Sequence, residues 1–143
     1  FDANLRQSYY SEAVLIDSLR LANIVKLNED ELDVVTEATG IGGSGQQVRA
    51  EILRDEFEID IVCITRGANG SLLIAANGCS DNPGLAAELC DAVGAGDAFT
   101  AAMIHGVLRS WDLNTINQYA NRVAALVASR TGAMPEISIG MAF

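Results

Sequence analysis

The sequence predicts an α/β fold with a mostly parallel sheet, on three observations. Short runs rich in β-branched residues alternate with longer segments whose apolar residues recur at helical period, as in layered α/β proteins. Near the middle of the chain, two such runs are separated only by a glycine-containing turn, which predicts an antiparallel hairpin at the sheet edge. The 143 residues are half hydrophobic, which is enough for the core of one domain.

The first part of the chain is predicted to be strand, helix and strand. Residues 1–5 form a short strand, and residues 8–21 form a helix with Ser8 or Ser11 as its N-cap. Residues 23–27, NIVKL, form a β-branched strand. Because FDANLR reads as the end of a strand and the first residue is Phe rather than Met, we expect a fragment, or one half of something larger.

Two helices are predicted on either side of a glycine loop. Residues 29–38 form a short acidic helix, with Asn28 as N-cap and Glu31 as its capping-box partner. Residues 40–45, GIGGSG, form the loop, and residues 46–57 form the second helix. The predicted inner face of that second helix consists of Val48, Ile52 and Leu53.

The hairpin lies in the next segment. Residues 60–65, DIVCIT, read as a buried strand, and residues 71–75 return as a strand after the turn RGANG. Residues 77–84 read as a polar loop and residues 86–90 as another short strand.

The last part is predicted to be two helices. One covers residues 95–109, and the other begins at Asn114 as N-cap and runs to about Arg130. No internal repeat and no linker divides the chain, so we treat residues 1–143 as one unit.

Charge and composition argue against several classes of partner. The net charge of −10 makes nucleic acid and anionic membranes poor partners. No apolar run approaches the roughly 20 residues of a membrane span, and the start shows no signal-peptide pattern. The cysteines, at positions 63, 79 and 90, have no metal-ligand spacing, which favours reduced thiols in a cytoplasmic protein.

The loop at residues 40–45 matches the glycine pattern G-x-G-x-x-G of dinucleotide-binding folds. In those folds the glycines follow a strand, whereas the segment before Gly40 is predicted to be helical. The alternative is a flexible connection between two helices. A strand ending just before Gly40 would favour a dinucleotide-binding oxidoreductase. The chain contains no G-x-x-x-x-G-K-[ST], which excludes a Walker-type phosphate loop.

The segment VGAGD, residues 93–97, is the better candidate for an anion site. Glycine lets the backbone N–H groups approach an anion closely, and the following helix adds the positive end of its dipole. Such donors stabilise a transferring phosphoryl group. Asp97, in the first turn of the helix, could then accept the proton of an attacking hydroxyl. The alternative is a carboxylate that only stabilises the helix N-terminus.

Two strand ends carry further candidates. Thr65, followed by Gly67 and Gly70, could present a hydroxyl and amides to a nucleotide phosphate, or the glycines could serve only the hairpin. Asn28 and Glu31 could be only a helix cap. Near phosphates, however, a carboxylate usually indicates a divalent cation such as Mg²⁺.

Five segments follow one another along the chain: FDANLR, KLNEDEL, TRGANG, DAVGAGDAF and ANRVAALVASRTGAMP. Together they resemble the C-terminal half of a ribokinase-like sugar kinase of the PfkB family, and the first two are most similar to fructokinases. DAVGAGDAF is the most specific element. The resemblance implies a ribokinase-like three-layer α/β/α fold, in which residues 1–143 are the C-terminal nucleotide-binding and catalytic part.

The resemblance also implies roles for individual residues. In such kinases the glycine loop forms the anion hole and its Asp is the catalytic base, while other motifs contact nucleotide phosphates, Mg²⁺ and adenine. The residues concerned are Gly94, Ala95 and Gly96 for the anion hole, Asp97 for the base, Thr65, Gly67 and Gly70 for nucleotide phosphates, Asn28 and Glu31 for phosphate and Mg²⁺ (Glu31 through water), Asn121 for the adenine, and Asp91 for a monovalent cation such as K⁺.

The chain departs from the family pattern in two respects. Ala92 stands where the pattern D-T-x-G-A-G-D has Thr, which removes a hydroxyl beside the anion loop. The chain also has only about half the family's length, and the absent half supplies most of the sugar pocket and its lid. Because excluding water and orienting the acceptor are large catalytic effects, we expect the fragment alone to be inactive.

We therefore expect a cytoplasmic, fructokinase-like carbohydrate kinase that uses ATP, Mg²⁺ and, beside Asp91, K⁺. Its partners would be a small-molecule sugar and ATP, with either a homodimer or a missing N-terminal half completing the enzyme. One alternative is a non-catalytic nucleotide-binding half that needs a partner chain. The other is the dinucleotide-binding oxidoreductase.

Overall fold

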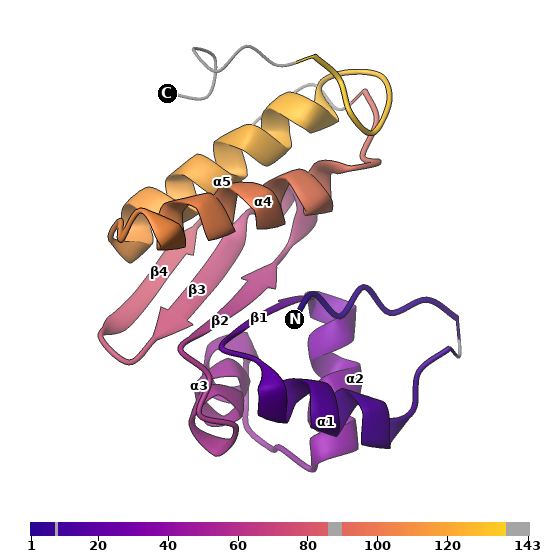
Figure 1. The fold of residues 1–143 in the computed structure, drawn as a ribbon, viewed down its shortest axis with the longest axis vertical. Helices are drawn as coiled ribbons and strands as arrows, with labels where there is room; N and C mark the ends of the chain where they lie inside the picture. Colours follow the sequence, from indigo (N-terminus) through magenta and orange to yellow (C-terminus); the bar gives the residue numbers. More distant parts are fainter. Residues whose placement is uncertain (8, 86–89, 137–143) are drawn as a thin grey trace. The chain divides into compact units, whose positions relative to one another are not determined.

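The computed structural model describes residues 1–7, 9–85 and 90–136. In chain order, which Figure 1 colours from indigo to yellow, the elements are α1 (Glu12–Leu21), β1 (Ile24–Asn28), α2 (Glu29–Thr39), α3 (Gln46–Glu56), β2 (Ile61–Thr65), the 3₁₀ turn η1 (Gly67–Asn69), β3 (Ser71–Ala75), β4 (Gly78–Asn82), α4 (Ala95–Leu108) and α5 (Leu113–Ala128). They belong to two compact units. Unit 1 comprises Phe1–Gly67 and Leu72–Ser80, and unit 2 comprises Ala68–Ser71 and Asp81–Phe143.

The sheet has four strands in the order β1-β2-β3-β4 (Figure 1). β1 and β2 are parallel, with a register that runs from Ile24 opposite Ile61 to Asn28 opposite Thr65, and they form the parallel part of the predicted sheet. The connections 66–70 and 76–77 are much shorter than the dozen or so residues of a parallel crossover, so β2, β3 and β4 are antiparallel neighbours.

Three predicted strand and loop assignments differ from the structure or lie outside it. The prediction of a polar loop at 77–84 is wrong, because strand β4 occupies most of that range. The sequence of β4, GCSDN, has no β-branched residue, and backbone pairing to β3 therefore decides its structure. The strand predicted at 1–5 is reduced to one parallel bridge between Asp2 and Lys26. The strand predicted at 86–90 falls largely on 86–89, outside the described residues.

The core of unit 1 lies between the sheet and helices α1 to α3. Its fully buried members, which come from all three helices and from β1 and β2, include Leu19, Val25, Leu27, Leu32, Val35, Ala50, Leu53, Val62 and Ile64. The predicted inner face of α3 is only partly right. Leu53 is buried, but Val48 and Ile52 are exposed, and Ala50 takes the inner position instead. Helix α1 begins after Ser11, whose Oγ accepts from the N–H of Val14, one of the two caps predicted.

Helices α4 and α5 form the core of unit 2. They approach closely at Gly106, where a Cβ would lie 2.9 Å from Cγ1 of Ile116 and 3.0 Å from the Trp111 ring. The N-cap predicted at Asn114 is wrong: Asp112 caps α5 by accepting from the N–H of Thr115 at 3.0 Å. The hydrogen bonds from Thr115 lower the pKa of the Asp112 carboxyl.

The three cysteines are free thiols. Cys63 lies in the buried part of β2, where burial raises the pKa of its thiol, whereas Cys79 and Cys90 are exposed.

Over the described ranges, none of the helices combines the length and apolar character that a membrane crossing requires.

Candidate functional site

The loop before α4 leaves the N-terminus of that helix without a side-chain cap. Gly94 is the N-cap of α4, with φ of +82°, and no side chain of a described residue caps this helix end. The N–H of Ala95 points to the carbonyl of Ala92 at 3.3 Å, while the N–H groups of Gly94 and Gly96 meet no acceptor within the described chain. Uncapped N–H groups at the positive end of a helix dipole are suited to bind an anion.

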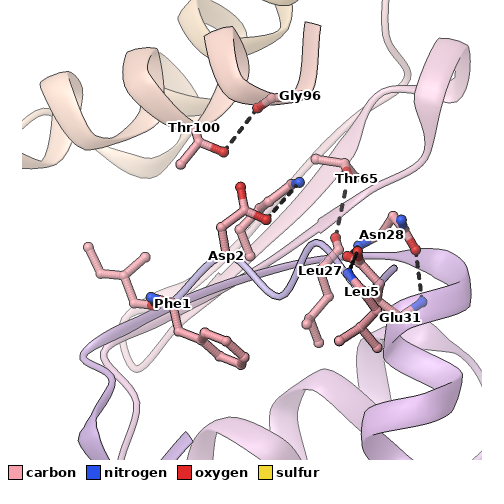
Figure 2. A network of polar contacts seen from close by, with 11 residues as sticks. Phe1, Asp2, Leu5, Leu27, Asn28, Glu31, Thr65, Gly96 and Thr100 are labelled. Carbon is pink, nitrogen blue, oxygen red and sulfur yellow. Dashed lines mark hydrogen bonds and ion pairs between the residues drawn. The ribbon is translucent and has the colours of Figure 1, made fainter. Parts of the chain in front are cut away.

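Asp97 lies in the first turn of α4 and is exposed. No side chain in the described parts of the chain bonds to its carboxylate. One turn further on, the Thr100 hydroxyl donates to the carbonyl of Gly96 at 3.0 Å (Figure 2), so that contact stays within the helix. Asp97 is therefore not the cap of its own helix, and its carboxylate is available for a ligand.

The chain after α5 holds this loop in place. Oδ1 of Asp91 accepts from the N–H of Val93 at 3.0 Å, and Oδ2 accepts from the N–H of Gly132 at 3.2 Å. The N–H groups of Cys90 and Asp91 donate to the carbonyl of Ala128 at 2.9 and 3.0 Å. The sequence did not predict these contacts between the loop and the chain around the end of α5. The contact with Val93, two residues on, is an Asx turn that the spacing could have indicated.

Gly94 is required by space as well as by φ. A Cβ at this position would lie 2.3 Å from the carbonyl oxygen of Ala133 and 2.9 Å from two further backbone atoms of that residue. The segment after α5 thus passes directly over the N-cap of α4. Only glycine allows both the left-handed φ and this approach.

Asn28 and Glu31 form the predicted capping box at the start of α2. The N–H of Glu31 donates to Oδ1 of Asn28 at 2.8 Å, and the N–H of Asn28 donates to Oε2 of Glu31 at 2.7 Å. Figure 2 shows the third contact, in which the N–H of Leu5 donates to Oε1 of Glu31 at 3.0 Å. Glu31 is 6% exposed, so its carboxylate also anchors the N-terminal segment to α2, which the sequence did not predict.

Replacing Glu31 with Gln is expected to lower the free energy of unfolding by about 1–3 kcal/mol, the usual cost of a buried hydrogen-bonding group left without its partner. A side-chain amide offers one acceptor oxygen where two backbone N–H groups now bind. Asp30→Asn is the matched control, because it removes the same charge from the same helical turn at an exposed position. Urea unfolding of both variants measures the difference, and equal effects would contradict this assignment.

The glycine turn after β2 divides into an open part and a packed part. Thr65 ends β2, and its Oγ1 donates to the carbonyl of Leu27 at 3.3 Å (Figure 2). Gly67 has φ of +56° and is exposed, with no atom within 4 Å of the position that a Cβ would occupy. Gly70 has φ of +80°, and a Cβ there would lie 2.0 Å from the carbonyl oxygen of Asn82. Gly70 therefore serves the packing of the hairpin, and Gly67 leaves open backbone for a ligand.

Asn121 lies on α5 and is bonded into a buried cluster with Ser71 and Asn117. The sequence pattern singled out neither Ser71 nor Asn117. No local signal could have found them, because the contact joins residues from β3 and α5.

In the described structure, the predicted site residues fall into separate groups. In unit 1, Asn28 and Glu31 share the capping box, and Thr65 and Gly67 follow each other at the end of β2. In unit 2, Asp91 and residues 94–97 form the loop before α4, and Gly70 and Asn121 both adjoin Ser71. Within the described ranges, no group of three or more His, Cys, Asp or Glu side chains could hold a metal ion.

The glycine loop at 40–45 follows a helix, as predicted. Gly40 is the left-handed C-cap of α2, with φ of 70° and its N–H bonded to the carbonyls of Thr36 and Glu37. A dinucleotide fingerprint needs a strand at this position. The segment before Gly40 is helix α2, so the described chain does not have the strand there that would favour an oxidoreductase.

Comparisons with known proteins cover nearly the whole chain. Residues 1–139 match the pfkB family carbohydrate kinase domain. Aminoimidazole riboside kinase from Salmonella typhimurium is 33% identical over 144 residues, which cover 94% of this chain and 43% of that protein. The chain spans about two fifths of the length of the curated relatives it matches.

Solved structures agree in fold. 2-dehydro-3-deoxygluconokinase from Thermotoga maritima has a TM-score of 0.85 at 21% identity, covering 99% of this chain and 47% of that one. A double mutant of fructokinase from Vibrio cholerae, solved with fructose, ADP and a potassium ion, has a TM-score of 0.76 at 29% identity, covering 94% and 45%. These likenesses confirm the predicted ribokinase-like α/β fold class.

Proposed function

The chain belongs to the pfkB family of carbohydrate kinases, and from this we propose that residues 1–143 are the C-terminal nucleotide-binding and catalytic part of an ATP-dependent sugar kinase. The observation that carries the proposal is the start of α4. It combines an uncapped helix N-terminus, a glycine N-cap and an exposed carboxylate in the first turn. Phosphoryl transfer to an alcohol needs this pair of features, an anion hole and a base.

We assign the anion hole to the backbone of Gly94, Ala95 and Gly96. Their N–H groups would donate to the equatorial oxygens of the phosphoryl group, where negative charge is spread in the transition state. Gly94 and Gly96 have N–H groups that no described residue engages, which supports the role. The contacts of Asp91 and Ala133 would keep this loop in one conformation before the substrate arrives.

We assign the catalytic base to Asp97. As the sugar hydroxyl attacks the terminal phosphorus, its proton passes to the Asp97 carboxylate, the new O–P bond forms, and ADP leaves with the electron pair of the bond that breaks. The exposed carboxylate supports this role, because it is not engaged in capping α4.

The remaining residues would bind the nucleotide and its cations. Thr65 and Gly67 present a strand end and open backbone to the phosphates, Gly70 shapes the same turn, and Asn121 would lie beside the adenine. Glu31 is only 6% exposed, and both of its oxygens accept backbone N–H groups, so we propose that it holds a magnesium ion through water rather than directly, with Asn28 beside it. Bound Mg²⁺ would neutralise charge on the nucleotide phosphates.

A monovalent cation is proposed beside Asp91. The support is the family resemblance of this position and the potassium ion in the Vibrio cholerae fructokinase structure. The two oxygens of Asp91 accept N–H groups from Val93 and Gly132, which leaves lone pairs for a cation. Phosphorylation rates measured in potassium and in tetramethylammonium salts would distinguish cation binding at Asp91 from a purely structural role of its two hydrogen bonds.

The acceptor is proposed to be a small sugar, with fructose first because of FDANLR and KLNEDEL. A riboside is the competing acceptor, since a relative that is 33% identical is named aminoimidazole riboside kinase. We place the enzyme in the cytoplasm and expect either a second copy or an N-terminal half to complete the acceptor pocket. The chain by itself would then bind nucleotide without turnover.

The second candidate is a non-catalytic nucleotide-binding half that acts beside a partner chain. It shares with the first candidate the uncapped backbone N–H groups at the start of α4, which suit a phosphate whether or not an acceptor is bound. In that case the loop at 94–97 would bind phosphate but would never meet an acceptor hydroxyl.

The proposal is tested by titrating the protein with ATP–Mg²⁺ in a calorimeter and by assaying phosphorylation of fructose, ribose and a purine riboside. Saturable binding together with turnover of one acceptor supports the kinase. Binding without turnover, also after addition of the N-terminal half of a relative, supports the non-catalytic alternative. Absence of ATP binding contradicts both.

A further inference from the structure

A buried polar cluster joins the start of β3 to helix α5 within unit 2. Ser71 and Asn117 are fully buried, and Asn121 is 8% exposed. Ser71 Oγ donates to Asn117 Oδ1 at 2.5 Å, and Asn117 Nδ2 donates to Ser71 O at 3.2 Å. Asn121 Nδ2 lies 2.7 Å from Ser71 Oγ, 2.8 Å from Asn117 O and 2.9 Å from Asn117 Oδ1.

Two backbone carbonyl oxygens determine the direction of the hydrogen bonds in this cluster. Ser71 O can only accept, so Nδ2 of Asn117 must face it and Oδ1 of Asn117 must face the Ser71 hydroxyl. Asn117 O can likewise only accept, so Nδ2 is the Asn121 atom that faces the cluster. This orientation of both amides is consistent with every contact, with the two Nδ2 hydrogens of Asn121 shared among three acceptors.

The arrangement leaves one side-chain atom of the cluster unused. Asn121 Oδ1 receives no hydrogen bond from a described residue, while its Nδ2 is fully engaged. Asn121 is thus presented as an acceptor rather than a donor. An acceptor at this position suits an amino group, such as the exocyclic amine of adenine.

The cluster also adjoins the glycine turn. Ser71 follows Gly70 directly, and Gly70 packs against the backbone of residues 82–84. A purely structural contact of this size would not need three polar side chains, because an apolar residue of similar volume fills space without requiring partners. Hydrogen bonds among the three polar side chains instead fix one orientation of each.

We infer that Ser71 and Asn117 are positioning residues for nucleotide recognition. They hold the amide of Asn121 with Oδ1 presented as an acceptor for the base. This inference rests on the proposed function, since Asn121 is assigned to the adenine there.

The test compares Ser71→Ala and Asn117→Leu with Gln118→Leu, an exposed change one residue further along α5. Dissociation constants are measured for ATP and for inosine triphosphate, which has a carbonyl in place of the adenine amine. Ser71→Ala removes only a hydroxyl, and Asn117→Leu keeps the volume but removes the amide. Thermal unfolding confirms that each variant is folded.

The unaltered protein is expected to prefer ATP over inosine triphosphate, and both cluster variants are expected to lose that preference. Their affinity for ATP should fall about tenfold, the loss expected for one hydrogen bond, with inosine triphosphate affinity nearly unchanged. Combining the two changes should add little, because they disrupt the same cluster. Gln118→Leu should retain the preference.

Other outcomes overturn the inference in distinguishable ways. If folded Ser71→Ala and Asn117→Leu keep the preference for ATP, the positioning role is wrong while the kinase function stands. An equal loss of affinity for ATP and for inosine triphosphate indicates a general structural role of the cluster and also overturns the inference. Equal binding of both nucleotides by the unaltered protein overturns the assignment of Asn121 Oδ1. If the unaltered protein binds neither, the proposed function itself fails.

Discussion

Replacing Asp97 with Ala is expected to lower kcat by about three orders of magnitude with little change in ATP affinity. The reason is that the carboxylate would act only as the acceptor hydroxyl attacks, and a positioned base contributes roughly 10²- to 10⁴-fold. Because Asp97 lies at the surface and does not cap α4, its loss should leave the helix folded. Removing a negative charge beside the anion loop could even tighten ATP binding slightly.

The measurement combines steady-state kinetics with calorimetric titration of ATP–Mg²⁺, in the enzyme that turns over sugar. Asp97→Asn keeps the size of the side chain and separates lost basicity from lost packing. Asp60→Asn is the control, since it removes an exposed carboxylate elsewhere. Near-normal turnover by Asp97→Ala would rule out the base, and a parallel loss of ATP binding would point instead to a damaged loop.

Replacing Gly94 with Ala is expected to abolish turnover and to lower the free energy of unfolding by more than about 3 kcal/mol, at the upper end of single substitutions. Two effects combine here. An alanine at φ of +82° costs roughly 1–2 kcal/mol. In addition, its Cβ would lie 2.3 Å from the carbonyl oxygen of Ala133, so either the loop or the chain after α5 must move. A displacement of about 1 Å in catalytic groups can cost 100-fold in rate.

Gly132→Ala is a matched control for this prediction. Gly132 has φ of +89°, so alanine there meets the same backbone strain, but nothing lies within 4 Å of its Cβ position. Chemical unfolding of both variants therefore separates strain from collision. Equal destabilisation would show that the contact with Ala133 is unimportant. Normal turnover by Gly94→Ala would show that the conformation of the loop does not matter for catalysis.

Local patterns in the sequence predicted the parts of the site that depend on a few neighbouring residues. The capping box of Asn28 and Glu31 was predicted in full, because both hydrogen bonds join residues three apart. The helix after the glycine loop and the α/β fold class were predicted as well, from hydrophobic period and from the alternation of strands and helices. The ribokinase-like form of that fold was implied by the family resemblance of the motifs.

Contacts between distant segments were not predictable in the same way. The bond from Leu5 to Glu31, the contact of Gly132 with Asp91 and the cluster around Asn117 each join residues more than twenty positions apart. A helical period also leaves the inner face uncertain by a residue or two, which is why Ala50 lies inside where Val48 was expected. Strand β4 was missed because its partner, and not its composition, determines it.

The two compact units are interleaved along the chain. The chain enters unit 2 at Ala68, leaves it after Ser71 and returns at Asp81. A recombination event between residues 71 and 81 would therefore inherit α5 without its own Ser71 and would leave the buried amide of Asn117 to meet a foreign residue. Exchange of residues 68–136 as one block would keep Ser71 with Asn117, but it would separate Leu72 and Ile74 from the rest of the unit 1 core. No single break point between residues 67 and 81 therefore preserves both units, and the two are expected to be inherited together.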